Sequence, residues 1–158
     1  NLLKEQVSIR NMVAILETIA DFASVSKDTT FLTEKTRQSI GRQICLQYAD
    51  EEKKLNVITI NPEIESKIIE ARVETVDGYV PVLDRAFLSS FINAISNKLM
   101  SLKDLNKTIV ILCSEEARVL VRKCTERELP GISVISAREL TGDIGFEVLG
   151  EIDFVLQN

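Results

Sequence analysis

The 158-residue sequence contains no histidine and no tryptophan, and aromatic side chains make up only 5% of it. Histidine is the side chain that most often serves as general base, proton shuttle or metal ligand near neutral pH. Its absence removes most hydrolase and zinc chemistries. A glycosidase site built on two carboxylates also needs an apolar pocket with aromatic platforms, which this composition does not favour.

Glycine and proline are also scarce, with 6 and 3 residues, and the mean hydropathy is close to zero. This composition excludes a collagen-like repeat, a low-complexity linker and a disordered tail. No apolar run approaches the roughly 20 residues that span a bilayer, and no signal peptide is recognisable. We expect a soluble chain with a buried core, of one domain or two very small ones. Because it lacks an initiating Met and opens on a helix-like stretch, we also expect it to be a segment of a longer protein.

The three cysteines, Cys45, Cys113 and Cys124, form no C-x-x-C pair and lie in apolar runs. We expect them to be buried, reduced thiols in a cytosolic protein. The formal charge is -5, and the acidic excess falls in residues 62–158. Since neither half has the basic excess of a nucleic-acid binder, we expect no nucleic-acid partner.

Residues 8–48 read as a helical hairpin. Ser8 is the predicted N-cap of a helix that ends near Ala23, and Asp28 or Thr29 opens a second helix that continues to Tyr48. The first helix has apolar residues at helical spacing, which predicts that one face points toward a core. These residues are Ile9, Met12, Val13, Leu16, Ile19, Ala20 and Ala23.

The rest of the chain alternates strand and helix patterns, which predicts an α/β fold. A strand, a helix and a strand after residue 107 form a βαβ unit with parallel strands. Residues 74–83 contain the Asp77-Gly78 turn signal and read as a loop. The predicted strands are 55–60, 108–113, 132–135 and 144–152, and the predicted helices are 62–73, 84–99, 114–128 and the short 137–140. We divide the chain into a helical part, 1–49, and an α/β part, 54–158.

The search for chemistry finds no catalytic, cofactor-binding or metal-binding constellation. The strand end at Cys113-Ser114 is a place where α/β proteins often hold ligands, but Glu115 and Glu116 already supply negative charge to the following helix N-terminus. Capping is therefore the favoured role of Ser114. Gly142 and Gly145 lack the third glycine and the helix opening of a dinucleotide loop.

The surface offers candidates for contacts with other proteins. Arg10, Glu17 and Asp21 form a charged stripe on the first helix, and Lys35, Arg37 and Arg42 make the second helix the most basic stretch. Solvated faces are the plain interpretation of both sets, and interfaces are the alternative. The stretch from Tyr79 to Val82 is unusually apolar for a loop and could dock on a neighbour.

Several stretches carry a resemblance to a known family. Asn1-Leu2-Leu3-Lys4-Glu5 precedes Val7-Ser8-Ile9-Arg10-Asn11 and Ile15 to Asp21, followed by Leu32 to Gln38 and Gly41 to Ile44. These residues, with 55–62 and 134–150, resemble the cytoplasmic C-terminal region of the large export-gate family of bacterial type III secretion (FlhA/InvA). Asn11 departs from the acidic residue expected after Arg10, and Thr36 from an aliphatic one.

The resemblance implies a membrane-anchored parent at the cytoplasmic face of the bacterial inner membrane, of which this chain is the end of the third cytoplasmic subdomain and the whole fourth. It implies a nonameric ring that receives export chaperones with their substrates and communicates with the ATPase complex, with no enzymatic activity. Only the missing N-terminal part would touch the membrane. Arg10, Glu17, Asp21, Arg37 and Arg42 are then the candidate ring or partner contacts.

Two alternatives stay open beside this flagellar interpretation. The chain could come from the homologous gate of a virulence injectisome, since residues 7–21 and the closing strand favour the flagellar branch only modestly. It could also be a small-molecule-binding regulatory α/β domain that uses the strand end at Cys113-Ser114.

Overall fold

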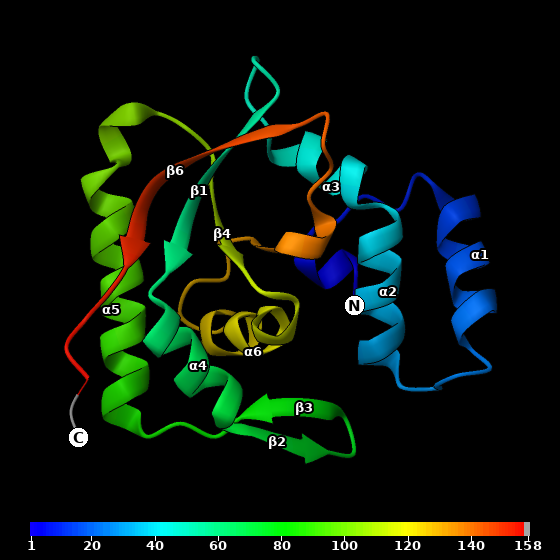
Figure 1. The fold of residues 1–158 in the computed structure, drawn as a ribbon, viewed down its shortest axis with the longest axis horizontal. Coiled ribbons are helices and arrows are strands. Elements are labelled where there is room, and N and C mark those ends of the chain that lie inside the picture. Colours follow the sequence, from blue (N-terminus) through cyan, green and yellow to red (C-terminus); the bar gives the residue numbers. More distant parts are fainter. Residues whose placement is uncertain (157–158) are drawn as a thin grey trace.

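Four parallel strands form the central sheet of the computed structural model, which describes residues 1–156, in the order β5-β4-β1-β6 (Figure 1). They are β1 (Lys54–Ile60), β4 (Ile109–Cys113), β5 (Val134–Ser136) and β6 (Gly145–Ile152). β4 and β5 are joined through α6 (Glu115–Thr125), whose N-cap Ser114 accepts the Ala117 N–H at 3.3 Å. The α/β fold class and the parallel βαβ unit are confirmed.

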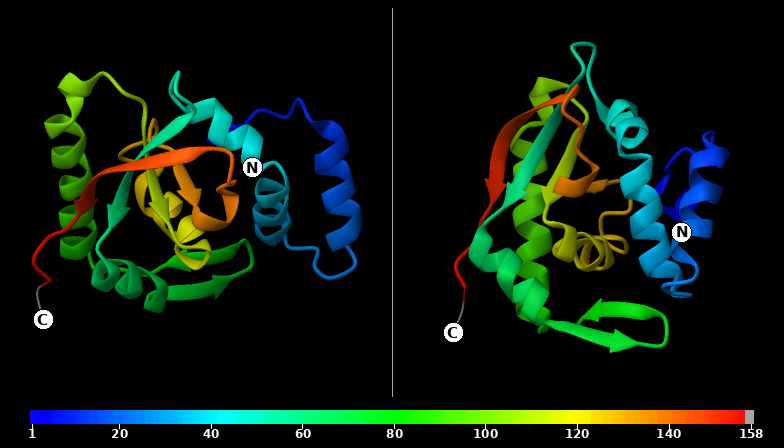
Figure 2. Two further views of the ribbon diagram at one scale, coloured as in Figure 1. Left: turned by 45° about the horizontal axis from the view of Figure 1, so that its top comes forward. Right: turned by 45° about the vertical axis from the view of Figure 1, so that its right-hand side comes forward.

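Each face of the sheet has its own core, because successive strand residues point to opposite faces. Val57, Val110 and Ile135 belong to one cluster of buried residues, and their neighbours Ile58, Ile111 and Val134 belong to the other. Helices α4 (Pro62–Glu70), α5 (Arg85–Ser101) and α6 cover the second cluster. The first cluster is covered by α3 (Gly41–Tyr48) and by the segment around η1 (Leu3–Glu5). Figure 2 shows the helical part on one side of the sheet and α5 on the other.

The first helix differs from the prediction in its start and in its buried face. α1 (Met12–Phe22) begins after Asn11, whose side chain accepts the Ala14 N–H at 3.3 Å, so Ser8 is not the cap. Its buried residues are Ile15 and Thr18, on the side that packs against α2 (Thr29–Ser39). The predicted inward face is therefore wrong within the described chain: Met12 is 43% exposed, Val13 67%, Leu16 57% and Ile19 37%.

The second predicted helix is broken at Ile40, which has φ -103° and ψ 19°. α2 ends at Ser39, and α3 begins at Gly41. An added Cβ on Gly41 would lie 2.5 Å from the backbone oxygen of Glu139. The break thus brings the start of α3 into close contact with η3 (Ala137–Glu139), and only glycine fits there.

Residues 74–83 are not a loop. β2 (Arg72–Thr75) and β3 (Gly78–Pro81) form an antiparallel hairpin, so α4 also ends earlier than predicted. The turn is built on Gly78, whose φ of 98° suits glycine. All four residues of β2 are exposed, which is why their sequence lacks the alternation of a half-buried strand.

The predicted division into residues 1–49 and 54–158 follows the change from a helical pattern to alternating strand and helix patterns, yet the two parts share a core. Ile15, Ile44 and Cys45 from the helical part lie in one buried cluster with Leu55 and Val57 of β1. Among residues 1–156, no helix combines the length and apolar character needed to cross a bilayer.

Candidate functional site

The strand end that sequence analysis considered for a ligand is filled by the chain itself. Glu65 from α4 accepts the backbone N–H of Ser114 at 2.8 Å, and the Ser114 side chain caps α6. Cys113 lies behind it, and burial raises the pKa of its thiol well above the ordinary value. No observation here favours a small-molecule site. Within residues 1–156, no cluster of three or more acidic, cysteine or histidine side chains is placed to hold a metal ion.

The most concentrated polar chemistry is a buried charge cluster between the helical and α/β parts, formed by Glu5, Glu34, Arg37, Arg118 and Glu139. Arg118, on α6, is 2% exposed. Its Nε donates to Glu34 Oε2 at 2.7 Å, and its Nη1 and Nη2 donate to Glu5 at 2.8 and 3.2 Å. One guanidinium thus joins α6 to both α2 and η1.

Arg37 makes the second half of the cluster. It is also 2% exposed, and its Nη2 lies 2.7 Å from Glu139 Oε1 and donates to the Val134 backbone oxygen at 3.2 Å. The other carboxylate oxygen of Glu139 accepts the Ser136 N–H at 2.8 Å in a capping box. Arg37 therefore fastens α2 to the start of β5 and to η3.

The surroundings move the pKa values of the two bridging carboxylates in opposite directions. Burial raises the pKa of both, and hydrogen bonds from Arg118 lower both. The pKa of Glu5 ends below its ordinary value, with further lowering by the charges of Arg37 and Arg122. The pKa of Glu34 ends above its ordinary value, because its burial outweighs Arg118 and the Glu139 charge adds to the rise.

Arg37 is the one predicted contact residue that lies inside the molecule, so the expectation of an exposed basic side chain is wrong at this position. Arg10, Glu17 and Asp21 are exposed, although Arg10 precedes α1 and does not share its face. Arg42 is exposed and donates from Nε to Asp143 Oδ2 at 2.8 Å. The structure does not bring these four residues together into one site.

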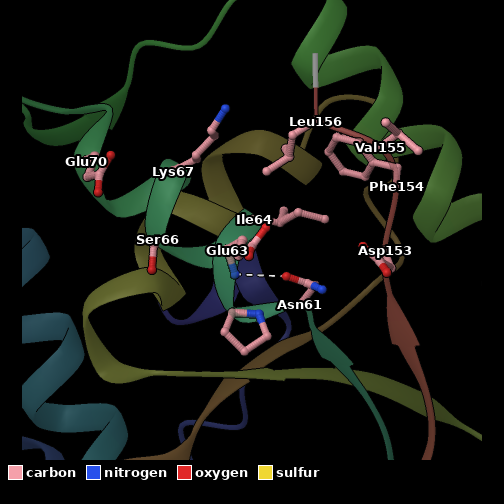
Figure 3. A pocket seen from close by; sticks show the side chains of 11 residues that line it. Asn61, Glu63, Ile64, Ser66, Lys67, Glu70, Asp153, Phe154, Val155 and Leu156 are labelled. Atoms are coloured by element: carbon pink, nitrogen blue, oxygen red, sulfur yellow. Dashed lines mark hydrogen bonds between the residues drawn. The ribbon is translucent and has the colours of Figure 1, made fainter. Parts of the chain in front are cut away.

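Several hollows lie on the surface of residues 1–156, among them a groove and a cleft. A groove of about 960 Å³ runs between α4 and residues 153–156, with Lys67 and Glu70 on one side and Phe154 and Leu156 on the other (Figure 3). A cleft of about 1220 Å³ lies between the hairpin, α2 and α6, with Arg118 in its lining. The groove holds no converging set of reactive groups, and Arg118, Glu5 and Glu34 in the lining of the cleft are already paired with one another.

Sequence reasoning missed the buried cluster, although two signals point to parts of it. Arg118 lies three residues before Val121 and seven before Thr125, within the buried stripe of α6. Ser136-Ala137-Arg138-Glu139 has the spacing of a capping box. No local pattern indicates Glu5 or Glu34, because their partner is about 80 to 110 residues away in the sequence.

The chain matches the FHIPEP family over residues 1–145. The flagellar biosynthesis protein FlhA of Borreliella burgdorferi is 43% identical over 152 residues, covering 96% of this chain and 22% of the relative. The low calcium response locus protein D of Yersinia pestis is 34% identical over 151 residues, covering 96% and 21%. The chain thus spans about a fifth of the length of these relatives, and the higher identity lies on the flagellar side.

Solved structures of similar proteins have the same fold. The Chlamydia pneumoniae CdsV protein, solved in complex with CdsO, has a TM-score of 0.85 and 32% identity, covering 96% of this chain and 45% of that one. Nonameric SctV-C of EPEC has a TM-score of 0.84 and 28% identity, covering 96% and 45%. The fold extends over nearly all of this chain in both.

Proposed function

Since this chain belongs to the FHIPEP family, we propose that it is the C-terminal part of the cytoplasmic region of a flagellar protein-export gate. In this role it is a module of a ring, to which export chaperones dock with their substrates. The parent protein is anchored in the bacterial inner membrane through a part outside this chain. The module binds other proteins and catalyses no reaction.

One observation carries the proposal: a relative with the same fold over 96% of this chain was solved as a nonamer. A second relative, solved with CdsO, supports contact with another component of the secretion system, which we assign to the ATPase complex. The exposed candidates for ring or partner contacts are Arg10, Glu17, Asp21 and Arg42. Arg37 leaves this set, because its side chain is buried and engaged in the charge cluster.

Charge reversal in the full parent protein tests the ring. Arg10→Glu and Asp21→Lys should each reduce the fraction of rings seen by mass photometry, because oppositely charged groups across an interface set its orientation. Lys103→Glu, an exposed position on the α/β part, is the matched control and should leave rings intact. Unchanged rings in Arg10→Glu and Asp21→Lys would remove these two residues from the interface.

Chaperone docking and the absence of catalysis need separate measurements. The parent protein should retain an export chaperone loaded with its substrate in a pull-down, and the purified protein should release no phosphate from ATP. If the wild-type parent protein neither bound a chaperone nor formed rings, the proposal would be contradicted. Measurable ATP hydrolysis would contradict its non-enzymatic part.

A further inference from the structure

The two outer strands of the central sheet differ in how their free edges are closed. β5 is only three residues long, and all three are buried. The Val134 oxygen accepts hydrogen bonds from Arg37 at 3.2 Å and from Arg118 at 3.3 Å. The Ser136 N–H donates to the Glu139 carboxylate at 2.8 Å. Side chains thus take the place of a neighbouring strand along the outer side of β5.

β6, at the other side of the sheet, has no such closure. With eight residues it is the longest strand of the described chain, and within residues 1–156 it pairs with β1 alone. Its first half, 145–148, keeps a regular register with 54–57 until a bulge at Leu149. Figure 2 shows β6 at the outer margin of the sheet. We call 145–148 the open edge, because an unpaired strand edge presents backbone N–H and C=O groups to other chains.

Two apolar side chains belong to the open edge. Phe146 and Val148 are 50% and 51% exposed. Their partners in β1 are Leu55 and Val57, which lie on the same face of the sheet and are fully buried in the core shared with α3. The helical part therefore covers this face at β1 and leaves it uncovered at β6.

The charged side chains around the open edge are already paired with one another. The pairs are Arg42 with Asp143 at 2.8 Å, Lys54 with Glu52 at 3.3 Å, and Lys107 with Glu147 at 3.6 Å. They leave no excess of either sign, so the edge offers no electrostatic attraction to a charged partner. Its free backbone groups and its two apolar side chains suit an uncharged segment in an extended conformation.

We propose that the open edge binds an extended, uncharged segment of a partner protein as a fifth strand of the sheet. The backbone of the segment pairs with 145–148, and its alternate apolar side chains pack beside Phe146 and Val148. The bulge at Leu149 limits the pairing to the first half of β6. This inference goes beyond the proposed function, because it adds a peptide-binding edge to a module of a ring.

A second copy of the chain is the weaker occupant. Two copies that join through the same edge are related by a two-fold axis and form pairs. The nine subunits of a ring such as SctV-C of EPEC cannot be divided into pairs. Neighbours in such a ring meet head to tail, through two different surfaces. The open edge therefore stays available to another protein when the ring has formed.

Peptide binding to the full parent protein tests the proposal. The probe is a fluorescent peptide of about eight residues that alternates valine and threonine. The control is the same peptide with its two central backbone nitrogens methylated, which removes a donor from each side of the extended peptide. The unmodified peptide should bind, and the methylated one should bind about tenfold more weakly, because two hydrogen bonds are lost. Absence of binding, or equal binding of the two peptides, would overturn the inference.

Substitutions on the open edge test its position. Phe146→Lys and Val148→Lys each place a charge on the edge and should weaken binding of the unmodified peptide about tenfold. Val155→Lys is the matched control, because Val155 is also apolar, is 89% exposed and lies outside every strand. It should leave binding unchanged. A melting curve for each variant shows whether the fold is retained, and two edge variants keep the test valid if one is unstable.

Hydrogen exchange locates the bound peptide. The backbone amides of 145–148 that do not pair with β1 should exchange more slowly once the peptide is added. Protection of these amides before the peptide is added would mean that another part of the parent protein or a second copy covers the edge, and would overturn the inference. Ring formation and chaperone retention are measured without the peptide. Their failure would contradict the proposed function and leave the result at the open edge unchanged.

Discussion

At the scale of single residues, the join between the helical and α/β parts combines the shared apolar core with a cluster of buried charges. Arg118 and Arg37 contact Glu5, Glu34 and Glu139. Together these five residues lie on four elements, η1, α2, α6 and η3. Such groups lose much of their hydration on burial, so they stabilise the fold only while every partner is in place. They also fix how α2 lies on α6 and η3, because a small shift breaks several charged hydrogen bonds at once.

Removing one member of the cluster should therefore be costly. Arg118→Met keeps most of the side-chain volume but leaves Glu5 and Glu34 without their shared cation, and we expect a loss of about 3–5 kcal/mol in the free energy of unfolding. Arg127→Met is the control, because Arg127 is 91% exposed and should change stability by less than about 0.5 kcal/mol. Urea unfolding followed by circular dichroism measures both. Equal losses in the two variants would refute a special role for the cluster.

The two bridging carboxylates should give stability curves of opposite slope. Folding lowers the pKa of Glu5, so its contribution to stability is present above the ordinary value of 4.5 and is lost as the pH falls through the lowered value. Folding raises the pKa of Glu34, so its contribution grows as the pH falls from the raised value toward 4.5. The free energy of unfolding of the wild type minus that of Glu5→Gln should thus decrease as the pH falls below 4.5. The free energy of unfolding of the wild type minus that of Glu34→Gln should increase as the pH falls toward 4.5. Two difference curves that change in the same direction with pH would contradict this assignment.

The sequence predicts which polar side chains cap helices but not which charged side chains are buried. Ser114 and Asp84 cap α6 and α5 as expected, because a cap is recognised from its neighbours in the chain. Arg37 was expected on the surface, since a charged side chain on a helix is solvated unless a partner reaches it. Its partners Glu5 and Glu139 are 32 and 102 positions away, and only the fold brings them together.

At the scale of elements, the break between α2 and α3 depends on Gly41. The substitution Gly41→Ala would favour a continuous helix by about 1 kcal/mol. The new methyl group would nevertheless lie 2.5 Å from the backbone oxygen of Glu139, and a backbone atom cannot easily move away. We expect a net destabilisation of about 1–3 kcal/mol, as for other overpacked contacts.

Gly142→Ala is the matched control, because an added Cβ at Gly142 would meet nothing within 4 Å. It should leave the melting temperature unchanged or raise it slightly. Thermal unfolding of the two variants side by side checks the prediction. If Gly41→Ala were as stable as Gly142→Ala, the close approach of α3 to η3 would not hold in solution.

Elements buried on both sides were predictable, and those that depend on distant neighbours were not. β4 and β1 are apolar and β-branched runs, so sequence and structure agree on them. The hairpin was missed because β2 is exposed along its whole length and carries no alternation. The burial of α1 was predicted on the wrong face, since periodicity shows that a face is apolar but not which partner covers it.

At the scale of the whole molecule, β1 couples the two cores. Leu55 and Val57 lie in the cluster shared with the helical part, and Ile58 and Ile60 lie in the cluster under α4, α5 and α6. A single strand cannot lose its contacts on one face and keep its geometry on the other. The helical part and the α/β part should consequently unfold together, although their sequences look like two units.

Leu55→Ala tests this coupling, because Leu55 is fully buried and its truncation should cost about 2–5 kcal/mol. Tyr48 packs against the shared core and Tyr79 lies in the hairpin, so the variants Tyr79→Phe and Tyr48→Phe each leave one fluorescent probe. In both backgrounds Leu55→Ala should shift the urea midpoint equally, whereas Leu105→Ala, at a half-exposed position, should shift neither. If Leu55→Ala lowered the urea midpoint measured from Tyr48 but not the one measured from Tyr79, the helical part would unfold alone. The charge cluster would then join two separately stable bodies.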